Sequence, residues 1–219
     1  MNPLVPFDHT YILYEESSLF SLAIAICSLI PILILVFLFS VFVATREIEC
    51  CLLAGGQVIN DAISSIIKNL LKLDRPSRGQ IYKKDGNLLY GMPSSHSQFI
   101  AFFVTYMLLR IFLQWPNQMS IYQKTINAGI LIAFQVAICY SRLYFEYHNL
   151  SQIWIGTLLG QLLGSLCFLA VGLLRDLNVI NRVLQLKICK LLYIKDSLHS
   201  KTPLKTFQQE WEEWNSQFS

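Results

Sequence analysis

Three short clusters of histidine, hydroxyl and cationic residues stand out along an otherwise apolar chain. They are Lys68 with Arg75-Pro76 after six residues, Pro93-Ser94-Ser95-His96, and Ser141-Arg142 with His148 after five residues. Cations and hydroxyls bind phosphate oxygens, and a histidine can act as nucleophile or as proton donor. If the fold gathers the three clusters, they predict a site for phosphoryl transfer.

Composition indicates the environment of this site. The chain has 219 residues, of which 54% are hydrophobic and only 14% charged, and its mean hydropathy is +0.47. Such a balance is typical of a membrane protein. A net charge of +3 without a basic stripe argues against a nucleic-acid partner. The six cysteines show no CxxC pair and no zinc-finger spacing, so we expect no metal site.

Five apolar segments are long enough, with their flanks, to approach the ~20 residues that a membrane-spanning helix needs. They cover roughly residues 19–44, 49–71, 98–115, 126–140 and 153–174. The first follows two glutamates and has no basic residue before it, which favours a retained anchor over a signal peptide. The predicted fold is an all-α, polytopic bundle of about five transmembrane helices in residues 1–175, with residues 176–219 as a tail.

The segment 49–71 differs from the others because it carries a polar stripe. Gln57, Asp61, Ser64 and Lys68 recur at spacings of three and four residues, which places them on one helical face. Polar residues on a membrane helix face protein or water rather than lipid. We therefore expect this helix to line an interior site, the alternative being an amphipathic helix at the membrane interface.

Five crossings place alternate loops on opposite sides of the membrane, and all three polar clusters fall on the same side. The chain after residue 174 is rich in cations, whereas the residues before the first span contain none. The positive-inside rule therefore predicts a cytosolic tail and a non-cytosolic site. The basic, amphipathic stretch at about 179–195 predicts an interfacial helix that packs on the membrane.

The second cluster opens the third spanning helix. Ser94 and Ser95 fall in its first turn, where unpaired amides and the helix dipole favour an anion. Together with Lys68, Arg75 and Arg142, this turn predicts a binding site for a multiply charged oxyanion. His96, on the same turn, is placed to protonate an oxygen that leaves the bound phosphate.

In this order, the three clusters resemble the motifs of the phosphatidic acid phosphatase type 2/haloperoxidase superfamily, from Lys68 to about Gln152. Two departures, Ser95 in place of the usual Gly and Gln152 in place of the usual Asp, are similar to the dolichyl pyrophosphate phosphatase branch. The closer resemblance rests on "PSSHSQ", on Tyr147-His148 and on Ser151-Gln152, and it covers most of residues 4–175.

The resemblance implies roles for these residues. His148 would attack phosphorus and form a phosphohistidine, while His96 would protonate the leaving group and then activate water. The phosphate oxygens would be held by Lys68, Arg75, Ser94, Ser95 and Arg142, and no cofactor is implied. Gln152 would orient the nucleophile without the negative charge of an Asp, and we consider Glu146 and Asp74 as sources of the missing charge.

The implied reaction is hydrolysis of dolichyl (polyprenyl) diphosphate to dolichyl monophosphate and phosphate, which recycles the lipid carrier of protein N-glycosylation. The resemblance implies a multi-pass protein of the endoplasmic reticulum membrane whose site faces the lumen and whose partners are the lipid substrate and the bilayer. Alternatives are a broad-specificity lipid phosphate phosphatase and, in a different class, an inactive lipid-binding or lipid-flipping protein. The intact histidine pair argues against the inactive protein.

Overall fold

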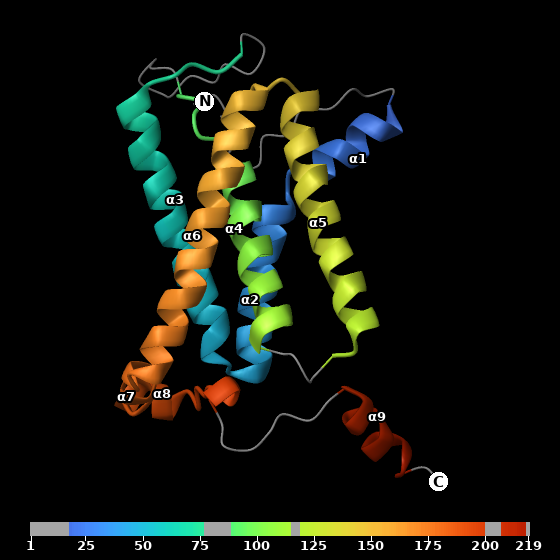
Figure 1. Cartoon of the computed structure of the whole chain (residues 1–219), viewed down its shortest axis with the longest axis vertical. Helices are drawn as coiled ribbons and strands as arrows, with labels where there is room; N and C mark the ends of the chain where they lie inside the picture. Colours follow the sequence, from blue (N-terminus) through green and yellow to red (C-terminus); the bar gives the residue numbers. More distant parts are fainter. Residues whose placement is uncertain (1–17, 77–88, 115–118, 200–206, 218–219) are drawn as a thin grey trace, which may run out of the picture.

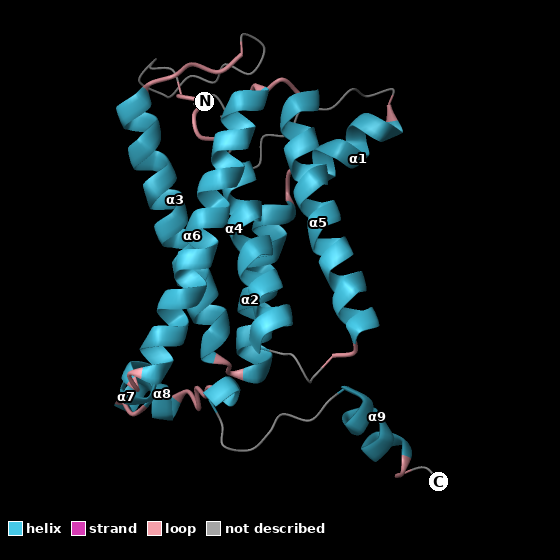
Figure 2. Ribbon diagram, in the orientation of Figure 1, coloured by secondary structure: helices cyan, strands magenta, loops and turns pink. Residues whose placement is uncertain are grey.

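A computed structural model describes residues 18–76, 89–114, 119–199 and 207–217, and helices account for most of them. Within these ranges no strand occurs, and the single β-bridge joins Glu47 to Lys195 (Figure 2). The prediction of an all-α fold is confirmed. Parts of the expected loops at 72–92 and 116–122 lie outside the described residues.

Four long helices run side by side through the molecule (Figure 1). They are α3 (Ile48–Leu71), α4 (Ser95–Leu109, continued by a π-helical turn at Arg110–Gln114), α5 (Ile121–Tyr144) and α6 (Leu150–Asp176). Each is long and apolar enough to cross a membrane, and a bent pair formed by α1 (Leu19–Cys27) and α2 (Ile30–Thr45) makes up to five spans. The predicted number of spans is confirmed.

The first span is not the continuous helix that its hydropathy predicts. The chain bends by 49° between α1 and α2, and Pro31 lies within the first turn of α2. Proline has no N–H to donate and its ring clashes with the preceding turn, so it fits the start of a helix better than the interior. The bend directs α1 away from α2 and toward α5, where the rings of Phe20 and Tyr144 meet edge to face at 5.7 Å.

Helix α4 lies at the centre of the bundle and packs closely on α6. Three glycines of α6, spaced four residues apart, face its backbone: Gly156, Gly160 and Gly164. A Cβ atom on Gly156 would lie 2.7 Å from the Ser94 carbonyl oxygen, and one on Gly164 would lie 2.6 Å from that of Phe102. Small residues allow such close contact between membrane helices. The start of α4 is therefore fixed against the start of α6.

The polar stripe of α3 faces the interior, as predicted. One of its buried residues differs from the prediction. Gln57, Asn60 and Ser64 are buried, whereas Asp61 is exposed. Positions 60 and 61 both border the predicted face. Burying an amide that finds a partner costs far less than burying a carboxylate, so Asn60 turns inward and Asp61 outward.

The tail does not form the single helix expected over 179–195. It forms α7 (Val179–Leu184) and α8 (Lys187–Leu191), followed by a 3₁₀ turn at Ser197–His199 and by α9 (Phe207–Asn215). The helices α7 and α8 lie across the end of the bundle at which α3 begins and α6 ends (Figure 1). Lys195 pairs with the turn between α2 and α3, accepting from the Ile48 amide at 2.9 Å and donating to the Arg46 carbonyl at 3.0 Å.

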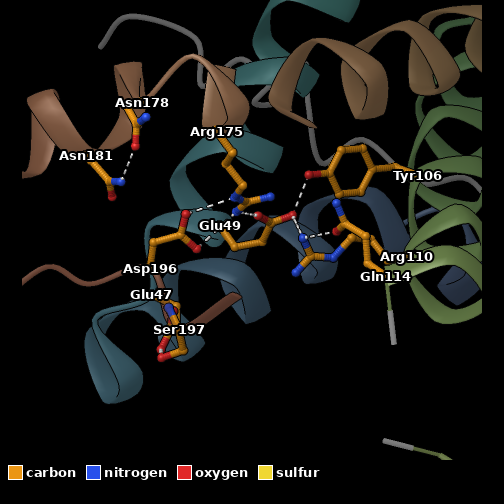
Figure 3. Close-up of polar contacts among 10 residues, drawn as sticks. All are labelled: Glu47, Glu49, Tyr106, Arg110, Gln114, Arg175, Asn178, Asn181, Asp196 and Ser197. Carbon is orange, nitrogen blue, oxygen red and sulfur yellow. Dashed lines mark hydrogen bonds and ion pairs between the residues drawn. The ribbon is translucent and has the colours of Figure 1, made fainter. Parts of the chain in front are cut away.

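A buried ionic cluster joins the helices at this end (Figure 3). Glu49 of α3 pairs with Arg110 at 2.8 Å and with Arg175 of α6 at 2.5 Å, and it also accepts from the Tyr106 hydroxyl. Asp196 of the tail completes the cluster by pairing with Arg175 at 2.8 Å. Only 14% of the Glu49 side chain is exposed, and the other three charged side chains are less exposed still.

Replacing Glu49 with Gln should destabilise the protein strongly. The change removes the carboxylate that pairs with both Arg110 and Arg175, and breaking a buried ion pair costs about 3–5 kcal/mol. A thermal melt of the detergent-purified protein, followed by tryptophan fluorescence, measures the effect. The matched control is Asp61→Asn, on an exposed position of the same helix, which should change stability by less than about 0.5 kcal/mol. Equal melting temperatures for the two variants would contradict this account.

Candidate active site

The predicted site residues meet at the opposite end of the bundle. Lys68 lies in the last turn of α3, Arg142 in the last turn of α5, and Ser95 opens α4. Arg75 follows α3, His148 lies between α5 and α6, and Gln152 is in the first turn of α6. In Figure 1 the first turn of α4 lies lower in the bundle than the ends of α3 and α6, and the side chains of Ser94, Arg142 and His148 are buried.

A closed set of contacts links the three clusters in pairs. The Lys68 ammonium donates to the Ser95 hydroxyl, which joins the first cluster to the second. The Ser94 amide donates to the Gln152 carbonyl at 3.1 Å, which joins the second to the third. The Gln152 side-chain amide donates to the Asp74 carbonyl at 2.7 Å, which joins the third back to the first. Segments far apart in sequence are thus held together by direct hydrogen bonds.

Gln152 also determines which nitrogen of the neutral His148 ring carries the proton. Because Gln152 Nε2 donates to a carbonyl, its Oε1 must be the atom that faces His148 Nδ1, at 3.1 Å. An amide oxygen can only accept, so His148 Nδ1 carries the proton and Nε2 keeps its lone pair. This tautomer leaves Nε2 available for attack on phosphorus.

Burial and nearby cations keep His148 neutral. Its side chain is buried between α5 and α6, and this burial is the largest cause that lowers the pKa of His148 to about 3. The positive charges of Arg75, Lys68 and Arg142 lower the pKa further, against a smaller upward effect of the Gln152 hydrogen bond. Burial and the three cations therefore leave the imidazole neutral, which is the form that a nucleophile needs.

The two arginines differ in what they contact. Arg142 is buried, donates to the hydroxyls of Ser141 (3.2 Å) and Ser28, and lies 5.0 Å from the centre of the Tyr147 ring. Arg75 has a buried Nε with no hydrogen-bond partner among the described residues. A buried guanidinium nitrogen without a partner is costly, and an oxyanion bound beside Arg75 would supply the missing acceptor.

Ser94 and His96 lie on either side of Ser95 at the start of α4. Ser94 is fully buried, and its hydroxyl accepts from Ser97 at 3.1 Å, so its predicted contact with phosphate stays a prediction. His96 is the second residue of α4, and its ring lies within electrostatic reach of His148 and Arg142. The end of the bundle that holds the cations thus also holds both histidines.

Three positions that the sequence did not single out help to shape the site. Asn149 caps α6, with its side chain accepting from the Gln152 amide at 2.9 Å. Ser28 reaches Arg142 from the break between α1 and α2. A Cβ on Gly91 would lie 2.7 Å from Gln152 Nε2 and 2.9 Å from Arg75 Cγ. Gly91 next to "MPSSH" and Asn149, which forms a capping box with Gln152, both have local signals, whereas Ser28 depends on a tertiary contact.

Asp74 was considered as a source of the negative charge that Gln152 lacks. Its contact with Gln152 does not supply that charge. Asp74 reaches Gln152 through its backbone carbonyl rather than its carboxylate. The contact orients the glutamine amide, and it adds a dipole but no full charge.

The fold and the site define a polytopic membrane protein with a largely buried site that contains cations and two histidines. The sequence profile described as "PAP2 superfamily" matches residues 49–176, and the chain belongs to this family. It is 43% identical over 214 residues to Dolichyldiphosphatase of Saccharomyces cerevisiae, covering 96% of this chain and 88% of the yeast protein. It is 31% identical over 171 residues to human Dolichyldiphosphatase 1, covering 75% of this chain and 70% of the human protein.

A solved structure shares the fold. The first transmembrane PAP2-type phosphatidylglycerolphosphate phosphatase from Bacillus subtilis superimposes with a TM-score of 0.50 at 20% identity. The match covers 64% of this chain and 67% of the bacterial one.

Replacing Gln152 with Glu should raise the pKa of His148 above its value of about 3. A carboxylate next to Nδ1 stabilises the charged imidazolium more strongly than the glutamine carbonyl does, because it adds a full negative charge. An NMR titration of protein labelled at its four histidines measures the change. The control is Gln185→Glu in the exposed tail, which should leave the titration of His148 unaltered. An unchanged pKa in the Gln152 variant would show that the amide does not govern this ring.

Replacing Gly91 with Ala should impair the site and leave the bundle folded. The new methyl group displaces Gln152 or Arg75, and a displacement of about 1 Å in a catalytic site can cost about 100-fold in rate. Phosphatase rates and melting temperatures of purified variants separate the two effects. Gly55→Ala is the matched control, because a Cβ there meets nothing within 4 Å. Full activity of the Gly91 variant would contradict the close contact.

Proposed function

We propose that this chain hydrolyses dolichyl (polyprenyl) diphosphate to dolichyl monophosphate and phosphate. The observation that carries the proposal is the closed set of contacts Lys68–Ser95, Ser94–Gln152 and Gln152–Asp74, which brings cations and histidines together at one end of the bundle. The choice of substrate is supported by the similarity to the yeast and human dolichyldiphosphatases.

The first step is attack by His148 Nε2 on the terminal phosphorus of the diphosphate. A bond forms between this nitrogen and phosphorus, and the bond from phosphorus to the bridging oxygen breaks. Dolichyl monophosphate leaves and takes a proton from His96. The neutral state of His148 and the position of its Nδ1 proton, held toward Gln152, suit it to this role.

The second step is hydrolysis of the phosphohistidine. His96, now neutral, takes a proton from water, and the hydroxide attacks phosphorus as the bond to His148 breaks. Inorganic phosphate leaves, and both histidines return to their starting states. The same residue acts first as acid and then as base, as two-step transfer to water requires.

Lys68, Arg75 and Arg142 stabilise the charge on the transferred group. A phosphoryl transition state spreads negative charge over three oxygens, so cations placed in advance lower its free energy. Arg75 Nε has an open donor for this purpose, while the Ser141 and Ser28 hydroxyls and the Tyr147 ring hold Arg142 in place. The first turn of α4 adds amides and a favourable dipole.

The orientation that we propose is a lumenal site and a cytosolic tail in the endoplasmic reticulum membrane. There the enzyme would recycle the lipid carrier released by protein N-glycosylation. The cations of the tail, at the end of the bundle away from the site, support this orientation. Residues 176–219 would pack on the cytosolic membrane surface, where Leu191 and Tyr193 of the α8 region expose apolar side chains beside lysines.

Purified protein in a chelating buffer should release phosphate from dolichyl diphosphate faster than from phosphatidate or a sphingoid phosphate. His148→Ala should lower the rate by about 1,000-fold or more, because it removes the nucleophile, and His96→Ala by about 100-fold or more. His199→Ala, in the tail, is the control and should retain wild-type activity.

Two results would overturn the proposal. Equal rates on all three lipids would indicate a broad-specificity lipid phosphate phosphatase. Rescue of dolichyldiphosphatase-deficient cells by the His148 variant would indicate a lipid-binding or lipid-flipping protein instead.

A further inference from the structure

The buried polar face of α3 makes an ordered series of contacts with α4. Gln57 donates to the Phe99 carbonyl at 3.1 Å and accepts from Asn60 at 3.2 Å. Asn60 accepts from the Gln98 side chain through its own side chain at 2.8 Å and through its carbonyl at 2.9 Å. Polar groups are costly between membrane helices unless they are paired, and here they pair across one interface. These contacts fix the register of α3 against α4.

The last contact of the series lies at the active site. Ser64 is 1% exposed, and its hydroxyl oxygen lies 3.2 Å from that of Ser95. The same Ser95 hydroxyl accepts from the ammonium of Lys68, which is one helical turn after Ser64. The Ser95 side chain therefore stands between a buried hydroxyl and a cation of the proposed phosphate site.

A lysine needs such support more than an arginine does. Its ammonium sits on a flexible four-carbon stem and makes no planar, two-point contact with a phosphate. Ser95 takes one of the three N–H groups and leaves two for other acceptors. A serine hydroxyl rotates freely unless a second partner holds it, and Ser64 is that partner.

We propose that Ser64 is a positioning residue of the reaction, acting through Ser95 to direct the Lys68 ammonium at the phosphate oxygens. Ser64 does not touch the substrate in this scheme. Its role rests on the proposed function, because it concerns how a phosphate-binding cation is held.

The test is a double-mutant cycle between Ser64→Ala and Lys68→Met. If Ser64 acts through Lys68, Ser64→Ala should lower kcat/KM for dolichyl diphosphate about ten-fold in the wild-type background, the loss expected for a weakened charged contact. In the Lys68→Met background the same change should have an effect of less than about two-fold. Ser65→Ala is the matched control, since Ser65 is the next residue of α3 and is exposed.

A purely structural role for Ser64 gives a different result. The two losses would then multiply in the double variant, and that outcome overturns the proposal. An effect of Ser65→Ala as large as that of Ser64→Ala, or none from Ser64→Ala, also overturns it.

The same cycle can be measured by binding of inorganic phosphate to the detergent-solubilised protein in a calorimeter. Ser64→Ala should weaken phosphate about ten-fold in the wild-type background and leave its affinity unchanged beside Lys68→Met. This measurement needs no turnover. If the wild-type protein fails to hydrolyse dolichyl diphosphate, the proposed function fails, whereas equal weakening of phosphate in both backgrounds refutes the role of Ser64.

Discussion

The hydrogen bonds of Gln152 are the interaction on which the site depends. One residue contacts His148 through its side-chain oxygen, Asp74 through its side-chain nitrogen and Ser94 through its backbone carbonyl. It therefore joins the loop between α5 and α6, the loop after α3 and the start of α4 to the first turn of α6. Because an amide carries an acceptor and a donor at fixed positions, the same side chain also selects the histidine tautomer. A carboxylate in its place has no N–H with which to hold the Asp74 carbonyl.

The remainder of the bundle supplies the rigidity that this network needs. The glycines of α6 bring the α4 backbone close, so the Ser94 amide lies within hydrogen-bond distance of Gln152. The hydrogen bonds of the Gln57 and Asn60 side chains with α4 fix how far along α4 the Lys68 side chain lies. At the opposite end of the bundle, Glu49 forms ion pairs with two buried arginines and so links the ends of three helices. Polar contacts inside an apolar bundle are strong constraints, because no water competes for them.

Much of this arrangement could be predicted from the sequence, and the failures have physical reasons. Hydropathy located the spans, and residue type with spacing located seven of the candidate site residues. The eighth, Gln152, came from the family resemblance, and the fold gathers all eight at one end. Hydropathy averaged over a segment carries no information about backbone geometry, so the break in the first span near Pro31 was missed. A helical period cannot separate Asn60 from Asp61, because which one turns inward depends on Gln98 of another helix. Arg175 is one of the cations after residue 174 from which the cytosolic side was predicted, yet it lies buried between two carboxylates.

The docking of the tail has a consequence for the design of shortened proteins. Asp196 neutralises Arg175, and Ser197 donates to Glu47 through both its amide and its hydroxyl. A chain ended at Ile194 would leave Arg175 to share Glu49 with Arg110, two cations against one anion in a buried setting. The useful limit for trimming, or for attaching a fusion partner, therefore falls after His199 and not at the end of the last membrane span.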